Sequence, residues 1–443
     1  MDDNLLNDMV SAALKAGADT AEAVFAQRQS LSVSVRLGEL EEVEREEARD
    51  LGLRVFVGNR SATVSGSDIS SEARAKLIER AVAMARLAPE DPYASLAPRE
   101  RLARGPFPDL DLIDVYEPTA EALEGQARLA EDAARSVDGV TNSDGGSASW
   151  SSASWRLVTS DGFSGSHAAT GHSLSCSAIA GEGAGMERGG EGRSARHFAD
   201  LPGAGDIGHE AGRSAVARLN ARKIASTTAP VIFENRLAMS LIGPLLGAIS
   251  GPSIARGSSF LKDRLNQQVF ARGVSLVEDP HRVRGLGSAP FDDEGVPTVR
   301  RALIDDGMLT TWLLNTSSAR QLGLETTGHA SRGLAGPSGV STSNLTLSTG
   351  TRDQAGLMAD AGTGLLVTSM FGPSLNGNTG DWSVGCSGLW FENGEITGPV
   401  TEITVAGNLI DIYARLIPGS DLEMRGANNA PSILVDGLAI AGK

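Results

Sequence analysis

Histidine is the side chain that most often binds zinc or acts as a general base near neutral pH, so we searched the histidines first. The chain has six: His167, His172, His197, His209, His281 and His329. His209-Glu210 begins like a zinc-peptidase helix, but Arg213 and Ser214 stand one turn further on, where a second imidazole would have to face the same metal. We therefore interpret this dipeptide as a chance occurrence.

The two cysteines, Cys176 and Cys386, offer little chemistry of their own. His172 and Cys176 are four residues apart, but residues 174–179 alternate like a strand, where four residues span roughly 13 Å, too far to share a metal. Cys386 is flanked by glycine in Gly385-Cys386-Ser387-Gly388, a setting that suits a nucleophile, but no histidine lies nearby in the sequence and a buried structural cysteine is commoner.

Two acidic runs remain as candidates for a hard cation: Asp292-Asp293-Glu294 and Asp305-Asp306. Each is followed by a glycine, and short acidic segments before glycine commonly form turns. We interpret both as turns with solvated carboxylates rather than as metal sites.

Composition excludes several classes of function. A chain of 443 residues with 41% hydrophobic residues has enough apolar material for more than one domain. The net charge of −16 disfavours direct binding to nucleic acid or to an anionic membrane surface. Apolar runs are shorter than the roughly 20 residues that cross a bilayer, and the N-terminus lacks the features of a signal peptide. With only two cysteines, we expect a cytoplasmic protein with no membrane segment.

The N-terminal elements follow from hydrophobic periodicity. Leu5, Leu6, Met9 and Val10 recur at helical spacing, residues 31–37 and 51–57 alternate as strands, and a second helix covers residues 77–85, which gives an αβββα order. The acidic segment 39–50 is interpreted as a solvated strand face rather than a docking surface. Residues 88–118 are interpreted as a linker.

Beyond the linker we expect a helix at 120–136 and a separate sheet of short strands over 140–198. Asp144-Gly145 and Asp161-Gly162 are its hairpin turns. A helix at 206–222 then precedes the main boundary near residue 224. Residues 237–249 predict a helix bent at Gly243-Pro244, and frequent Gly and Asn turns then predict a barrel or sandwich.

The predicted fold class is therefore α+β with two domains. Residues 1–223 form an N-terminal α/β domain with antiparallel sheets and sub-regions at about 1–90 and 118–223. Residues 224–443 form a C-terminal β-rich domain that is barrel-like or a sandwich.

Several C-terminal segments, in order, resemble the TldD/PmbA family, once called modulators of DNA gyrase. They include Gly257-Ser258-Ser259-Phe260, the run from Pro290 to Thr298, Thr327-Gly328-His329-Ala330, the run from Glu402 to Leu409, and the run from Pro431 to Leu438. With the αβββα start, the resemblance covers nearly the whole chain. It implies relatives of two kinds, a TldD type that is a zinc peptidase and a PmbA or TldE type.

The TldD type is implied to bind zinc through a helix-borne HExxxH motif and a later cysteine. In this chain the corresponding helix reads Leu241 to Ala248 without histidine or carboxylate, and the tail from Asp421 to Pro431 has no thiol. The general base is missing as well, since the motif's glutamate would activate zinc-bound water. The pattern resembles the PmbA/TldE branch, so we expect neither metal nor catalytic residues in this chain.

The resemblance thus implies the non-catalytic subunit of a metalloprotease complex that degrades or processes small or unfolded peptides. Its partner would be a TldD-type subunit that holds zinc. The alternative is a stand-alone, homodimeric peptide-binding or regulatory protein linked to gyrase or toxin–antitoxin systems. A third hypothesis, an autonomous enzyme that recruits metal through residues such as His281, His329 or Asp292, is disfavoured.

Peptide contacts are predicted at a few polar residues. Strand edges bind extended peptides through main-chain hydrogen bonds, and asparagine amides add further partners. The candidates are His329, which is equally well explained as a loop histidine with satisfied hydrogen bonds, and Asn376, Asn378, Asn428 and Asn429, for which ordinary turns are the competing interpretation.

Overall fold

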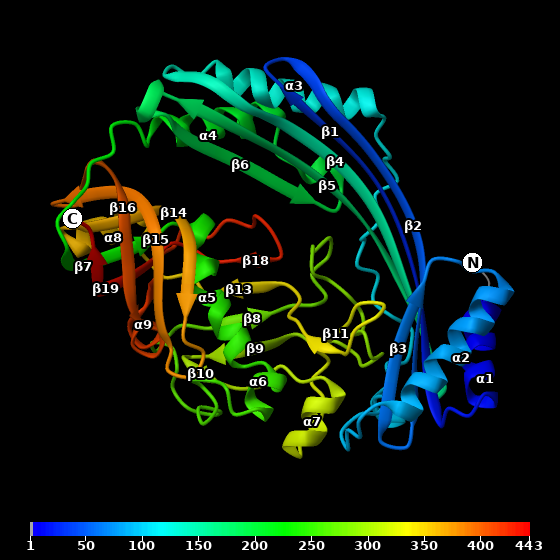
Figure 1. Ribbon diagram of the computed structural model, residues 1–443. Coiled ribbons are helices and arrows are strands. Elements are labelled where there is room, and N and C mark those ends of the chain that lie inside the picture. The colour runs from blue at the N-terminus through cyan, green and yellow to red at the C-terminus, as the bar shows by residue number, and fades with distance from the viewer. Residues whose placement is uncertain (1–2) are drawn as a thin grey trace.

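A curved six-stranded antiparallel sheet dominates the N-terminal half in the computed structural model, which describes residues 3–443 (Figure 1). The strand order is β3-β2-β1-β4-β5-β6. We call residues 3–216 the arch. Its elements are α1 (Asp3–Lys15), β1 (Thr20–Arg36), β2 (Glu39–Val57), β3 (Arg60–Gly66), α2 (Ser71–Leu87), α3 (Ala120–Arg135), β4 (Val140–Thr159), β5 (Ser164–Ala180), β6 (Glu187–Ala195) and α4 (Ala204–Val216).

The predicted αβββα start is confirmed, but the prediction of a separate second sheet is wrong. Strands β4 to β6 continue the first sheet because β4 pairs with β1 along most of its length, from Val35↔Gly146 to Glu22↔Thr159. Asp144-Gly145 is not a hairpin turn either. It lies inside β4 at an irregularity of the ladder with β5, where Gly145 has a φ of 104°. Asp161-Gly162 does connect β4 to β5, as predicted.

The helices cover only the convex side of the arch. Because strand residues alternate between faces, Val33, Ala148 and Leu174 share the face that packs against α3 and α4. The two helices approach each other closely at Gly208, where a Cβ would lie 2.0 Å from the carbonyl oxygen of Ala130. Helices α1 and α2 cover the other end of the sheet (Figure 1). The concave side is therefore free of helices and faces the rest of the chain.

The C-terminal half, which we call the body (residues 227–441), contains a closed five-stranded barrel. Strands β16, β15, β14, β7 and β19 follow one another, and β16 pairs with β19 to close the ring. The predicted α+β class with a barrel-like C-terminal region is confirmed. The barrel elements are β7 (Thr227–Phe233), β14 (Gly364–Leu375), β15 (Asp381–Glu392), β16 (Glu395–Asn408) and β19 (Ile433–Ala441), with β17 (Ile417–Pro418) beside β19.

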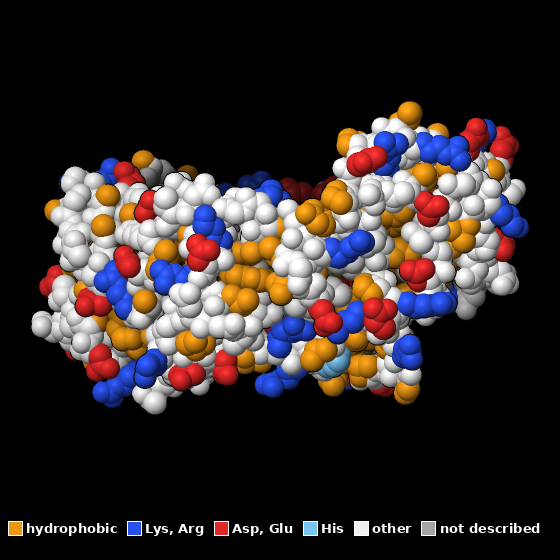
Figure 2. Space-filling model, turned by 90° about the horizontal axis from the view of Figure 1, so that it is seen from below, with side chains coloured by type: hydrophobic (Ala, Val, Ile, Leu, Met, Phe, Trp, Pro, Cys, Tyr) orange, Lys and Arg blue, Asp and Glu red, His pale blue; other side chains and the backbone are white. Residues whose placement is uncertain are grey.

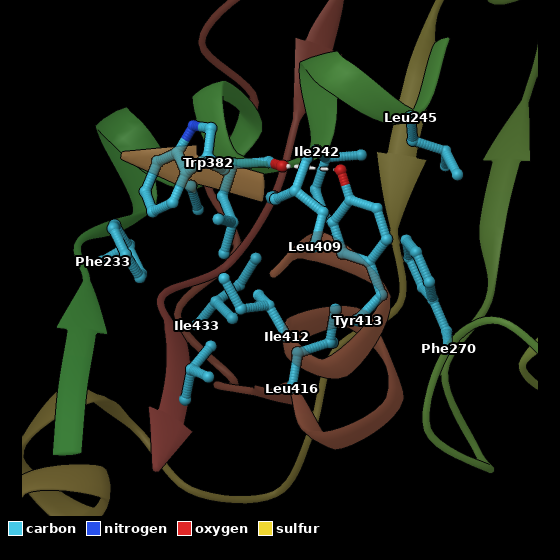
Figure 3. Close-up of a cluster of buried hydrophobic side chains, with 14 of the residues drawn as sticks. Phe233, Ile242, Leu245, Phe270, Trp382, Leu409, Ile412, Tyr413, Leu416 and Ile433 are labelled. Carbon is cyan, nitrogen blue, oxygen red and sulfur yellow. Dashed lines mark hydrogen bonds between the residues drawn. The ribbon is translucent and has the colours of Figure 1, made fainter. Parts of the chain in front are cut away.

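Shorter elements complete the body. They are α5 (Asn235–Ala248), α6 (Gly251–Ala255), β8 (Leu276–Glu278), β9 (Arg301–Asp305), β10 (Met308–Leu309), α7 (Thr316–Leu322), β11 (Ala330–Ser331), β12 (Gly339–Val340), β13 (Leu345–Leu347), α8 (Gln354–Ala361), α9 (Leu409–Arg415) and β18 (Asn428–Asn429). The core between the barrel, α5 and α9 is apolar, and the Tyr413 hydroxyl donates a hydrogen bond to the carbonyl oxygen of Leu241 at 3.1 Å (Figure 3).

The surface carries both signs of charge. On the face seen from below, Lys and Arg side chains alternate with Asp and Glu, and among the described residues they gather into no extended positive area (Figure 2). No helix within residues 3–443 is both long enough and apolar enough to span a membrane.

Candidate functional site

Serines cover the concave face of the arch sheet. They alternate with the residues that pack against α3 and α4, so they lie on the opposite face of the sheet. That concave face is the one turned toward the body (Figure 1). Register places Ser32, Ser149, Ser173 and Ser194 side by side on β1, β4, β5 and β6. We call this the serine face: Ser30, Ser32, Ser34, Ser147, Ser149, Ser151, Ser173, Ser175, Ser177 and Ser194.

The serine face is polar, shallow and free of bulk. Each hydroxyl can donate one hydrogen bond and accept others, so the face can bond a neighbouring main chain of any sequence. Only a few of these hydroxyls bond within the chain, for example Ser173 with Ser194 at 2.7 Å. Serine recurs at every second position over 30–34, 147–151 and 173–177, and this sequence pattern could have predicted the serine face.

Two adjoining hollows of about 440 and 390 Å³ lie where the β6 edge of the arch meets the body. Glu191 of β6 is 7% exposed and stands between them. Its carboxylate accepts hydrogen bonds from Arg193 and from Arg425 at 2.5 and 2.7 Å, and from Arg236 at 3.5 Å. Arg236 and Arg425 are far from Glu191 in the sequence, so no local pattern predicts that they meet it.

Glu234, just before α5, adds a second carboxylate to these hollows, with its side chain 12% exposed. Burial raises the pKa of Glu234, while Arg236 beside it opposes that shift at a distance of 2.7 Å. Arg218 lies nearby and donates to the carbonyl oxygens of Arg188 and Thr368 at 2.8 and 3.2 Å. The hollows are thus lined by fixed charges of both signs, which suits a zwitterionic or peptide ligand.

Backbone edges are open at the same place. Strand β6 ends the six-stranded order, so no strand in residues 3–443 pairs with its outer side. Strand β14 pairs with β7 only from Leu365 to Val367, and the following Thr368 and Ser369 line the smaller hollow opposite Gly190 and Gly192 of β6. An extended peptide can add to such edges through main-chain hydrogen bonds.

The predicted asparagines lie elsewhere. Asn376 and Asn378 are exposed in the β14–β15 connection, where the Asn378 N–H donates to Asn376 Oδ1 at 3.0 Å in a local turn. Asn428 is exposed in β18, whereas Asn429 is buried and its carboxamide bonds the nearby backbone of Arg425 and Gly426. None of the four lines either hollow at the β6 edge, so their contact with peptide stays a prediction.

His329 is buried at 4% exposure, with both ring nitrogens hydrogen-bonded. One bonds Thr327 Oγ1 and the other Glu278 Oε2, each at 2.7 Å. Although burial opposes ionisation of Glu278, its bonds with His329 and Ser343 lower its pKa. These contacts are those expected of a loop histidine whose hydrogen bonds are satisfied within the chain. His329 does not line the hollows at the β6 edge.

The interpretation of Asp292-Asp293-Glu294 as solvated carboxylates is wrong. The segment does turn, but Asp292 and Glu294 are 6% and 4% exposed because the segment is enclosed where the body meets the arch. Asp292 accepts three backbone N–H bonds, and Glu294 accepts bonds from the backbone and hydroxyl of Thr316. The other acidic run, Asp305-Asp306, is an exposed turn as predicted.

The buried carboxylates predict a pH dependence of stability. Burial raises the pKa of both Asp292 and Glu294, and Asp292 is raised further by the charge of Glu294. Above the ordinary glutamate value of 4.5, the native state therefore binds more protons than the unfolded state, and the free energy of unfolding falls as pH rises through the native pKa. Glu294→Gln keeps an acceptor for Thr316 but cannot titrate, so this fall should be smaller in urea unfolding across a pH series.

The exposed Asp305→Asn variant is the control and should follow the unsubstituted chain at every pH. If the free energies of unfolding of Glu294→Gln and of the unsubstituted chain change equally with pH, the raised pKa of Glu294 is contradicted.

Zinc does not fit the residues present where the resemblance would place it. Helix α5 buries Leu241, Ile242 and Leu245 in the barrel core, and Gly243 and Gly247 have no neighbouring atom within 4 Å of a Cβ position. Apolar side chains and glycine supply no metal ligand. Cys176 and Cys386 are buried thiols whose pKa burial raises to about 12, which disfavours the thiolate a metal needs. Within residues 3–443, no group of three or more His, Cys, Asp or Glu side chains is placed to hold a metal.

Comparison with known proteins gives one consistent result. Domain 1, the central domain and the C-terminal domain of PmbA/TldA metallopeptidases match residues 21–85, 112–219 and 226–442. The metalloprotease PmbA of Escherichia coli O157:H7 is 38% identical over 99% of this chain and 96% of its own length. A metalloprotease PmbA homolog of Haemophilus influenzae is also 38% identical, over 98% of this chain and 94% of its own length.

Solved structures share the whole architecture. A candidate modulator of DNA gyrase from Bacteroides thetaiotaomicron superposes with a TM-score of 0.92 at 27% identity, covering 99% of this chain and 98% of that one. TldE from Thermococcus kodakarensis superposes with a TM-score of 0.87 at 20% identity, covering 99% and 100%, and shows likeness of fold.

Proposed function

The chain belongs to the PmbA/TldD metallopeptidase family, and from that premise we propose that it is the non-catalytic subunit of a two-chain metallopeptidase acting on small or unfolded peptides. In this proposal the zinc ion and its ligands belong to a TldD-type partner. This chain supplies a wall of the chamber in which the peptide lies.

One observation carries the proposal. The helix that the resemblance associates with zinc, α5, is present in the body, yet its inward-facing side chains are those of a hydrophobic core. A zinc-bound water would need both metal ligands and a general base, and Leu241, Ile242 and Leu245 provide neither. Catalytic groups must then come from another chain.

The arch supports a peptide-binding role. The serine face offers hydroxyls without side-chain bulk, and the open edges of β6 and β14 offer backbone partners beside the charged hollows. Main-chain bonding of this kind tolerates many sequences, which suits processing of unfolded chains. We also propose a cytoplasmic location, which the two free, buried cysteines support.

The test is reconstitution. The chain purified alone should contain no stoichiometric zinc and should not hydrolyse an unstructured peptide. With a TldD-type protein that carries the HExxxH motif, it should form a complex whose peptidase activity rises with added chain and levels off at a fixed ratio. Zinc content and hydrolysis are measured on the same preparations.

Three controls make the result decisive. The partner alone reports its own activity, the partner with its first motif histidine replaced by alanine should stay inactive in the complex, and a chelator should abolish hydrolysis. Chelator-resistant hydrolysis by this chain alone would overturn the proposal. A stable homodimer that never associates with a TldD-type protein would support the stand-alone regulatory alternative instead.

A further inference from the structure

A third hollow, of about 470 Å³, opens on the concave side of the arch at the end of the serine face nearest the body. Its floor is made of small residues: Ala153 and Ala169 are direct partners on β4 and β5, and Ala26 and Ala48 lie on β1 and β2. Trp155 of β4 and Leu334 of the body form its apolar walls. The volume falls within the range of small-molecule sites, about 300–1,000 Å³.

Arg196 brings to this hollow a positive charge that is paired with no carboxylate of residues 3–443. Its guanidinium donates to the carbonyl oxygens of Thr170 at 3.0 Å, Gly285 at 3.4 Å and Leu286. Burial lowers the pKa of Arg196, and no carboxylate within residues 3–443 offsets that shift. These three bonds use three of the five N–H donors of an arginine, so donors remain for a ligand.

The other charged side chains at the rim are an arginine in an ion pair and a partly exposed carboxylate. Arg28 forms an ion pair with Glu46 at 3.3 Å, and both of those side chains are exposed. Asp50 also lines the hollow and is partly exposed. The half-buried charge that no carboxylate in the described part of the chain contacts is therefore the cation of Arg196, next to alanine, leucine and tryptophan surface. A carboxylate bonded directly to an apolar residue complements this arrangement.

We propose that this hollow binds the C-terminal residue of a peptide, with an apolar side chain over Ala153 and Ala169 and the terminal carboxylate at Arg196. The inference rests on the proposed function, which places peptides on this face. It adds that the peptide is recognised by its C-terminal end and that its last residue is apolar.

The register of β5 sets the reach of such a peptide. Ala169 lies in the hollow, and Ser175 lies opposite Gly192 at the β6 edge. Six residues of strand separate them, about 20 Å. A peptide anchored here therefore crosses the serine face and reaches the β6 edge with its sixth or seventh extended residue, so affinity should rise with length up to that point.

The experiment measures binding to the full chain by fluorescence anisotropy. The probe is an N-terminally labelled octapeptide of polar residues ending in leucine with a free carboxylate. The same peptide ending in leucine amide should bind about tenfold more weakly or worse, since a hydrogen bond to a charged group is lost. A peptide amide with an internal glutamate and no apolar terminus distinguishes a side-chain carboxylate from the terminal one and should also bind weakly.

Two variants locate the site. Ala153→Leu and Ala169→Leu each fill the floor and should weaken binding of the leucine acid about tenfold, whereas Ala355→Leu on the exposed surface of α8 should have no effect. Equal binding of acid and amide, full affinity in both filling variants, or no binding of the leucine acid would each overturn the proposal. Binding that follows this pattern in a chain that never supports peptidase activity would leave the site standing while the proposed function fails.

Discussion

Replacing Arg332 by methionine is expected to lower the free energy of unfolding by about 3–5 kcal/mol, because it leaves a buried carboxylate without its closest cation. The Arg332 side chain of the body is fully buried and donates to Glu22 of β1, whose side chain is 1% exposed. The remaining cation, Arg54, is 3.7 Å from Glu22. Chemical denaturation of the full chain measures the loss.

Methionine keeps most of the buried length of the arginine stem and leaves the Arg332 backbone N–H free to bond Asp293 at 2.8 Å. Glu22→Gln and the double variant complete a cycle, and a coupling energy between the two sites is expected because they are in direct contact. Arg45→Met removes an exposed pair with Glu47 and should cause no measurable loss. Equal stability of Arg332→Met and Arg45→Met would contradict the assignment of this pair as a buried junction.

Replacing Glu191 by glutamine is expected to cost a similar amount, about 3–5 kcal/mol, because one buried carboxylate serves three arginines. Arg236 and Arg425 belong to the body, and Glu191 belongs to the edge of the arch. Loss of the Glu191 carboxylate should therefore also increase the mobility of residues 420–430, which carry Arg425. Limited proteolysis near residues 420–430 and chemical denaturation report the two effects.

Glu423→Gln is the matched control for this variant. Glu423 contacts two of the same arginines, Arg193 and Arg425, but its side chain is 48% exposed. Its loss should stay below about 1 kcal/mol, since water screens exposed pairs. Similar losses for the two glutamine variants would show that Glu191 is not the centre of the network.

The two junctions should act independently. The pairs Glu191↔Cys176, Cys176↔Gly146 and Gly146↔Val35 align Glu191 of β6 with Val35 of β1. Val35 is about 43 Å along β1 from Glu22, and the three strand spacings between β1 and β6 add about 14 Å across the sheet. Mutations separated by more than about 7–10 Å without shared partners usually add. The combined variant Arg332→Met with Glu191→Gln should therefore lose the sum of the two single effects in chemical denaturation.

Much of the fold could be predicted from local patterns. The helical spacing of Leu5, Leu6, Met9 and Val10 and the alternation over 31–37 and 51–57 report the αβββα start, because amphipathic elements repeat with the period of their own geometry. The barrel-like C-terminal region followed from turn signals. The continuous sheet did not, because pairing β1 with β4 depends on residues more than a hundred positions apart.

The candidate site divides in the same way. The absence of zinc ligands from α5 can be read directly from the sequence. The alternating serines can be read there too, because residues at every second position share one face of a strand. Burial is different. Asp292 and Glu294 look like a solvated turn in the sequence but are buried in the folded chain, where Ala330 and Thr316 donate hydrogen bonds to them.

By itself, the sequence determined the element types, the family resemblance and the absence of zinc ligands from α5, because each depends on residues that are neighbours in the chain. The tertiary structure alone decided that Glu191 meets Arg236 and Arg425, that Glu22 meets Arg332, and that Arg196 stands beside an alanine floor. Charges far apart in the chain come together only when folding brings their strands and loops into contact, and no local pattern records that proximity.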